Sequence, residues 1–95
     1  MRLLVRNGTV VSPTGRVAND VLVDGETIAA VGAPGFFDAL LGEVEVIDAT
    51  GKYVVPGGVD VHVHMELPFG DSVSSDTFET GTRAAAWGGV TTVVD

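Results

Sequence analysis

Short runs of alternating apolar and polar residues, separated by turn residues, fill the first half of the chain. Leu3–Arg6 and Thr9–Val11 flank Asn7-Gly8, a dipeptide that favours a two-residue hairpin because both positions accept a positive φ. A second turn is expected at Ser12–Gly15. The pattern predicts short strands that belong to a structural sheet or sandwich.

The alternation continues to residue 55 and predicts four further strands. Phe36–Leu41 is the exception, because an apolar stretch of that length is consistent with either a helical turn or a loop. Asp24-Gly25 predicts a tight turn between the first two of these strands. The four strands are expected at Val17–Val23, Thr27–Val31, Glu43–Asp48 and Tyr53–Val55.

The pattern changes at Pro56-Gly57, where we place a domain boundary. In residues 59–64 valine alternates with Asp60, His62 and His64, which predicts a short buried strand with these three side chains on one face. Two imidazoles on one rigid face are suited to bind a single metal ion. The alternative is a pair of ordinary polar residues on a solvated face.

The rest of the chain predicts a loop, a helix and a second buried strand. Met65–Asp71 contains Pro and Gly and is expected to be a loop, and Asp76, with Glu79 three residues later, predicts a helix that begins with a capping box. Gly88-Gly89 ends the helix, and Val90–Asp95 forms the strand. The order indicates a right-handed βαβ unit with parallel strands. One such unit cannot cover both strand faces, so we expect a longer natural protein or a truncated chain.

Composition excludes several classes of function. The chain has 95 residues, 45% of them hydrophobic, which is typical of a globular protein. It contains neither an apolar run long enough to span a membrane nor a signal peptide. The absence of cysteine excludes disulfides and thiolate metal sites, and it is consistent with a cytoplasmic location. A net charge of -8 with only five basic residues argues against nucleic-acid binding.

Three motifs together resemble the dihydropyrimidinase and hydantoinase branch of the amidohydrolase superfamily, the cyclic amidases. The His-x-His pair is shared across the superfamily, whereas the Pro-Phe-Gly loop and the helix sequence are more specific. The resemblance extends over the whole chain. The motifs are Val54–His64 (VVPGGVDVHVH), Leu67–Gly70 (LPFG) and Gly81–Gly89 (GTRAAAWGG).

The resemblance implies an α/β fold in two parts. Residues 1–56 would be the N-terminal part of a β-sandwich, and residues 57–95 the first strand, helix and second strand of a (β/α)₈ TIM-type barrel. It also implies two zinc ions per full-length chain, one of them bound by His62 and His64. A carboxylated lysine, further histidines and a catalytic aspartate would lie outside these residues, so no catalytic residue is expected here. Lys52 is not the bridging lysine, because it precedes the barrel in a turn.

The implied function is that of a zinc-dependent cyclic amidohydrolase. Such an enzyme opens dihydropyrimidines or 5-substituted hydantoins, which are small cyclic amides or imides, by metal-activated hydroxide, and works as a homo-oligomer, a tetramer by resemblance. Allantoinase and dihydroorotase activities are alternatives, as is a non-catalytic dihydropyrimidinase-like scaffold. The presence of both His62 and His64 argues against the scaffold. Residues 1–95 alone are expected to be inactive and poorly folded.

Other side chains near the histidines are weaker candidates for the site. By resemblance, Met65, Leu67 and Phe69 would line the substrate pocket, and the alternative is a small hydrophobic core under their loop. Asp60 is expected on the face of the histidines but one step deeper, where it would touch the metal ligands or pack against a neighbouring strand. Asp95 is expected at the same rim, at the end of the second strand, where it would contact the metal ligands.

Overall fold

The structure is a computed structural model that describes residues 1–95. The chain divides into two compact units, Met1–Val55 and Pro56–Asp95. Its mixed α/β character, with strands predominating, agrees with the predicted class. The assignment of the two parts to a sandwich and a barrel stays a prediction. No helix of the chain has the length and apolarity needed to cross a membrane.

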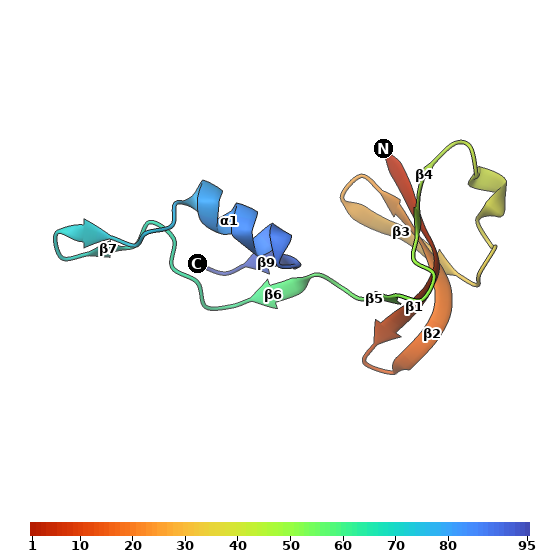
Figure 1. The fold of residues 1–95 in the computed structure, drawn as a ribbon, viewed down its shortest axis with the longest axis horizontal. Helices are drawn as coiled ribbons and strands as arrows, with labels where there is room; N and C mark the ends of the chain where they lie inside the picture. The colour runs from red at the N-terminus through yellow and green to blue at the C-terminus, as the bar shows by residue number, and fades with distance from the viewer. The chain divides into compact units, whose positions relative to one another are not determined.

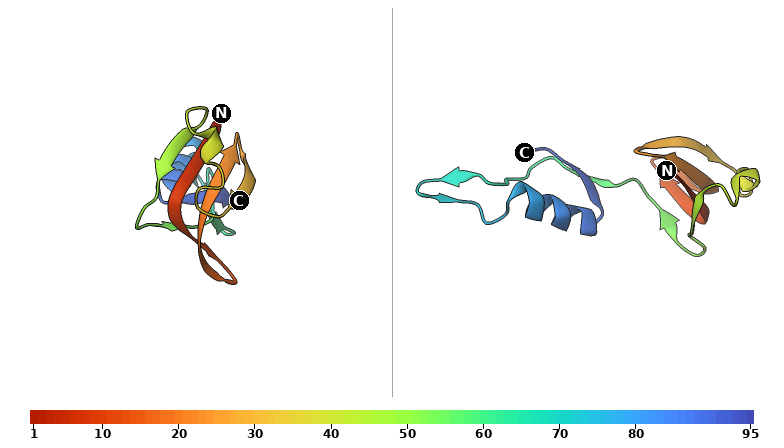
Figure 2. Two further views of the ribbon diagram at one scale, coloured as in Figure 1. Left: turned by 90° about the vertical axis from the view of Figure 1, so that its right-hand side faces the viewer. Right: turned by 90° about the horizontal axis from the view of Figure 1, so that it is seen from above.

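A five-stranded sheet forms the first unit (Figure 1). The strands β3, β2, β1 and β4 are neighbours in that order, and β5 also pairs with β1. The pairs β1–β2 and β2–β3 are antiparallel, whereas β4 and β5 run parallel to successive parts of β1. Figure 2 shows β1 and β2 as a long twisted ribbon. The bounds are β1 Arg2–Ser12, β2 Gly15–Asp24, β3 Thr27–Gly32, β4 Glu45–Asp48 and β5 Tyr53–Val54.

The predicted hairpin at Asn7-Gly8 is wrong, because β1 runs straight through both residues. The register shifts there by one residue against β2, and Asn7 takes a φ of 65°, which is the geometry of a β-bulge. Gly8 is needed for a close approach, since an added Cβ would lie 2.5 Å from Val54 Cγ2. The hairpin between β1 and β2 is instead at Ser12–Gly15, the second predicted turn.

The core of the first unit lies where the loop after β3 packs on the sheet. Leu4, Leu22 and Phe37 are buried together, with Leu40 and Val44 partly buried against them. Phe37 directly precedes the 3₁₀ helix η1 (Asp38–Leu40). The helical turn is therefore the correct choice between the two alternatives left open for this stretch.

A fully buried carboxylate joins the bulge to the same loop. Asp20 on β2 has no exposed surface. Its Oδ1 accepts a hydrogen bond from the Asn7 backbone N–H at 2.9 Å, and its Oδ2 accepts one from the Gly35 N–H at 3.0 Å. A buried carboxylate needs such donors, and by accepting both hydrogen bonds Asp20 holds two irregular segments in place.

The second unit has the predicted order of strand, helix and strand. The first strand β6 pairs in parallel with the last strand β9, and α1 contacts β9 (Figure 1). In place of the predicted loop, β7 and β8 form a small hairpin that turns at Gly70, with φ 60°. The bounds are β6 Gly58–Asp60, β7 Pro68–Phe69, β8 Ser72–Val73, α1 Phe78–Trp87 and β9 Val90–Val93.

The first strand of this unit is shorter and more exposed than predicted. It ends at Asp60 instead of His64, and Val59 and Val61 are 61% and 72% exposed. The last strand is also only partly buried. Both predictions of a buried strand are therefore wrong for this chain, because two strands and one helix cannot cover both faces of a sheet.

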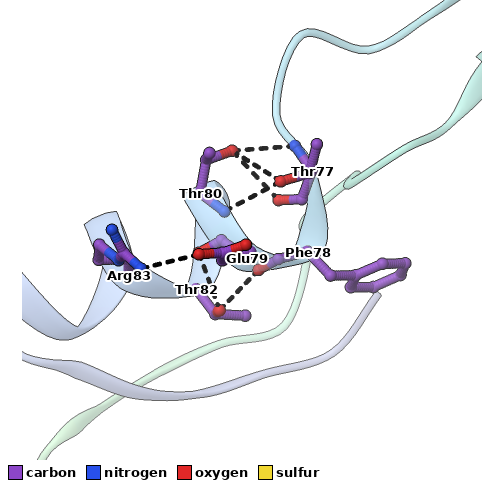
Figure 3. Close-up of polar contacts among 6 residues, drawn as sticks. All are labelled: Thr77, Phe78, Glu79, Thr80, Thr82 and Arg83. Atoms are coloured by element: carbon purple, nitrogen blue, oxygen red, sulfur yellow. Dashed lines mark hydrogen bonds and ion pairs between the residues drawn. The ribbon is translucent and has the colours of Figure 1, made fainter.

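The helix begins one residue later than the capping prediction placed it (Figure 3). Thr77 is the N-cap: its Oγ1 accepts a hydrogen bond from the Thr80 N–H at 3.0 Å, and Thr80 Oγ1 accepts one from the Thr77 N–H at 2.9 Å. Glu79 forms an ion pair with Arg83 at 2.8 Å instead of completing the box. Gly89, with φ 84°, follows the C-cap Gly88, as expected for a helix stop.

Candidate metal site

The two histidines lie just beyond the carboxyl end of β6. Backbone pairing with the segment after β9 continues past the strand, because the Val94 N–H donates to the Asp60 carbonyl at 2.8 Å and the Val63 N–H donates to the Val94 carbonyl at 3.4 Å. This pairing keeps the His62–His64 segment beside the end of β9.

The imidazole rings of His62 and His64 converge on each other. Their Nε2 atoms are 3.1 Å apart, and the rings are nearly perpendicular, at 87°. Two nitrogens that bind one zinc ion at about 2.0–2.1 Å with a tetrahedral angle are about 3.3 Å apart. Two lone pairs cannot face each other at this distance without a proton or a cation between them. The pair therefore fits two corners of a zinc coordination sphere.

Residues 1–95 supply only this pair of ligands. No group of three or more His, Asp and Glu side chains is arranged to hold a metal ion, and the chain has no cysteine. A structural zinc site is almost always four-coordinate, and a catalytic one has about three protein ligands. Any further ligands must therefore come from outside these residues.

Asp60 and Asp95 both contact the backbone beside a histidine. Asp60 Oδ1 accepts a hydrogen bond from the His62 N–H, and Asp95 Oδ1 accepts one from the Met65 N–H, each at 3.1 Å. Both carboxylates thus hold the segment that carries the imidazoles. Contact with a metal ligand's ring stays a prediction for both.

The structure separates the three apolar residues that were expected to share a pocket. Met65 is buried, and an added Cβ on Gly81 of α1 would lie 2.9 Å from its Sδ. Leu67 is 41% exposed and Phe69 80% exposed on the β7–β8 hairpin. Met65 therefore packs against the helix, and the role of the three residues in substrate binding stays a prediction.

Glu66 is the residue at this site that sequence reasoning missed. Its φ is 53°, its N–H donates to the Asp76 carbonyl at 2.9 Å, and its Oε2 accepts a hydrogen bond from the Phe78 N–H at 2.9 Å. The only signal in the sequence was an acidic residue upstream of a helix. No local pattern indicates that the chain folds back across the hairpin to bring the two together.

Comparisons with known proteins give one consistent family. The amidohydrolase family profile matches residues 45–94. The chain is 54% identical to a D-hydantoinase from Streptomyces coelicolor, over 99% of this chain and 20% of the relative. It is 47% identical to a D-hydantoinase from Geobacillus stearothermophilus, over 100% of this chain and 19% of the relative.

A solved structure gives the same result. The crystal structure of dihydropyrimidinase from Brevibacillus agri superimposes with a TM-score of 0.87 at 49% identity, over 100% of this chain and 20% of that chain. The resemblance predicted from the motifs is therefore confirmed. The chain spans about a fifth of the length of the relatives it matches.

Proposed function

The chain belongs to the amidohydrolase family, and from this premise we propose that the protein carrying it is a zinc-dependent hydrolase of cyclic amides. Dihydropyrimidines and 5-substituted hydantoins are the proposed substrates, since the similar proteins are named D-hydantoinase and dihydropyrimidinase. The amidohydrolase family is generally metal-dependent. The observation that carries the proposal is the convergence of His62 Nε2 and His64 Nε2 at 3.1 Å.

In this proposal His62 and His64 hold one of two zinc ions per chain. Bound zinc generates a nucleophile from water at neutral pH and polarises the carbonyl oxygen of the amide. Residues 1–95 contribute two neutral imidazole nitrogens, His62 Nε2 and His64 Nε2, at a fixed separation. Asp60 supports that task by accepting the His62 backbone N–H. The remaining ligands and the acid/base group come from outside residues 1–95.

The proposal includes the architecture around the site. Residues 1–56 are assigned to a β-sandwich and residues 57–95 to the start of a (β/α)₈ barrel. Barrel active sites lie at the carboxyl ends of the strands, and the histidines follow the carboxyl end of β6, which is parallel to β9. Further barrel strands and helices would cover Val59 and Val61. A cytoplasmic homotetramer is the expected assembly.

The test uses the protein that carries this chain, assayed for bound zinc by mass spectrometry and for ring opening of dihydrouracil and a 5-substituted hydantoin. We expect two zinc ions per chain in the unaltered protein. His62→Ala and His64→Ala should each lose zinc and reduce hydrolysis to background. Arg83→Ala is the matched control, because Arg83 is exposed on α1 and pairs only with Glu79.

Four outcomes would contradict the proposal or part of it. Absence of zinc from the unaltered protein, or undiminished hydrolysis in either histidine variant, refutes the metal assignment. Bound zinc with hydrolysis of allantoin or dihydroorotate only would refute the proposed substrates. A protein that assembles into its oligomer but hydrolyses no cyclic amide would indicate a non-catalytic scaffold.

A further inference from the structure

We propose that Glu66 is a positioning residue for the His62–His64 pair. Its carboxylate attaches the chain just after His64 to the first residue of α1 and so keeps the two imidazoles at the separation a metal ion needs. The inference rests on the proposed function, because it takes the pair to be a metal site. It deepens that function by naming a residue that contacts no metal and sets the geometry of those that do.

The backbone of Glu66 is held in a conformation that side chains other than glycine rarely adopt. Its φ of 53° lies in the left-handed region, which costs roughly 1–2 kcal/mol for a residue with a Cβ. Two hydrogen bonds of 2.9 Å, from its N–H to the Asp76 carbonyl and from the Phe78 N–H to its Oε2, offset that cost. Such strain persists only where the surroundings enforce it.

The N-terminus of α1 explains why a carboxylate suits this position. Phe78 is the first helical residue, and its N–H is among those that the helix itself leaves without a partner. The Thr77–Thr80 capping box satisfies two other N–H groups in the same turn (Figure 3). Glu66 supplies the missing acceptor together with a negative charge, which the helix dipole favours at this end.

The attachment reaches His64 through one intervening residue. Met65 is fixed on both sides, because its N–H donates to Asp95 Oδ1 at 3.1 Å and its buried side chain packs against Gly81. The Ser74 hydroxyl also donates to the His64 carbonyl, at 3.5 Å. Rotation of the His64 backbone would therefore break the contacts of Met65 and Glu66 with α1, with Asp76 just before it and with Asp95 just after β9.

Loss of the Glu66 carboxylate should therefore increase the distance between His62 Nε2 and His64 Nε2 and weaken metal binding. Supporting groups around metal ligands typically change metal affinity by 10- to 100-fold. Glu66 acts through the backbone and touches no imidazole ring, so we expect the lower end of that range, about 10-fold.

The test titrates the metal-free form of the whole protein with Zn²⁺ against a chelator, and with Co²⁺ while its visible spectrum is recorded. Glu66→Ala should weaken Zn²⁺ binding about 10-fold and alter the Co²⁺ spectrum, and Glu66→Gln, which keeps an acceptor oxygen, should recover part of the affinity. Glu66→Gly adopts the left-handed backbone without strain and should still bind as weakly as Glu66→Ala. If Glu66→Ala fails to fold, Glu66→Gly decides the outcome.

The control is Glu79→Ala. The Glu79 carboxylate lies in the same turn of α1 and pairs only with Arg83, so the Zn²⁺ affinity of this variant should be unchanged. The inference is overturned if Glu66→Gly or Glu66→Ala keeps the Zn²⁺ affinity and the Co²⁺ spectrum of the unaltered protein. A lower melting temperature in either variant does not change this conclusion. If His62→Ala still abolishes metal binding in that case, the proposed function stands without it. If His62→Ala binds metal normally, the proposed function itself fails.

Discussion

Gly57, the residue directly before β6, is a sharp test of the packing between the two parallel strands. A Cβ added at Gly57 would lie 2.1 Å from Thr91 Oγ1, 2.3 Å from Thr91 Cγ2 and 2.7 Å from Thr91 Cβ. Threonine is branched at Cβ, so rotation about χ1 cannot remove all three atoms from the contact. At the next residue, Gly58, the nearest atom is Val90 Cγ2 at 3.4 Å, an ordinary contact distance.

Gly57→Ala should therefore force β6 and β9 apart, whereas Gly58→Ala should not. Overpacking of this kind costs about 1–3 kcal/mol, which corresponds to a roughly 5- to 150-fold increase in the equilibrium constant for local opening. Gly58→Ala is expected within about 0.5 kcal/mol of the unaltered protein. Because both substitutions add the same methyl group at neighbouring positions, Gly58→Ala is a matched control.

Amide hydrogen exchange in the whole protein measures this difference locally. The reporters are the Gly58 N–H, which donates to the Gly89 carbonyl, and the Val94 N–H, which donates to the Asp60 carbonyl, each at 2.8 Å. Both should exchange faster in Gly57→Ala. Equal exchange rates in Gly57→Ala and Gly58→Ala would refute the reasoning.

A second substitution should reverse part of the effect. Thr91→Ala in the Gly57→Ala background removes the two closest atoms and leaves one contact at 2.7 Å, so recovery should be incomplete. A double-mutant cycle isolates this coupling. Effects of Gly57→Ala and Thr91→Ala that simply add would show that the two side chains do not meet.

Three further predictions concern single side chains. Asp20→Ala removes the acceptor of two partly buried hydrogen bonds, from the Asn7 and Gly35 backbone N–H groups, and should destabilise the first unit by about 1–3 kcal/mol in total; an unchanged denaturation midpoint would contradict this. Thr77→Ala removes the N-cap of α1 and should cost about 1 kcal/mol, seen as faster exchange in its first turn; unchanged exchange would count against the cap. Hydrogen bonds from the Thr50 hydroxyl and then the Thr50 N–H lower the pKa of Asp48 below its usual value, so its stabilising contribution is present above that value and is lost as the pH falls through the folded pKa. Asp48→Asn should therefore flatten the acid dependence of the unfolding midpoint, and an unaltered profile would refute the assignment.

Asn7-Gly8 shows that a local sequence pattern predicts the backbone conformation of a residue better than it predicts which strands pair beside that residue. Asn7 does adopt a positive φ, as the dipeptide indicates. Whether such a residue forms a hairpin turn or a bulge depends on which strands pair beside it, and the decisive neighbour of Gly8 is Val54 on β5. That strand is far away in the sequence, so no local window contains the information.

The helix start has a similar explanation at shorter range. Asp76 and Thr77 are both good N-cap residues, and the sequence favoured the pair with an acid three residues later. In the structure Thr80 returns the hydrogen bond to Thr77, while Glu79 pairs with Arg83. The existence of the helix and its glycine stop were predictable from the sequence. The choice between adjacent caps depended on competing side-chain contacts.

The histidine pair was recognised from its spacing, but the spacing alone does not produce its geometry. Along a regular strand, Cβ atoms at positions i and i+2 are about 6.5 Å apart and their side chains run side by side. The strand ends at Asp60, and the imidazole nitrogens converge to 3.1 Å. The chain bends at Val61, directly after β6, and Asp60 and Glu66, on either side of the histidines, hold the backbone of this segment. It follows that substitutions at these two carboxylates should change the separation of the His62 and His64 Nε2 atoms through the backbone that they hold.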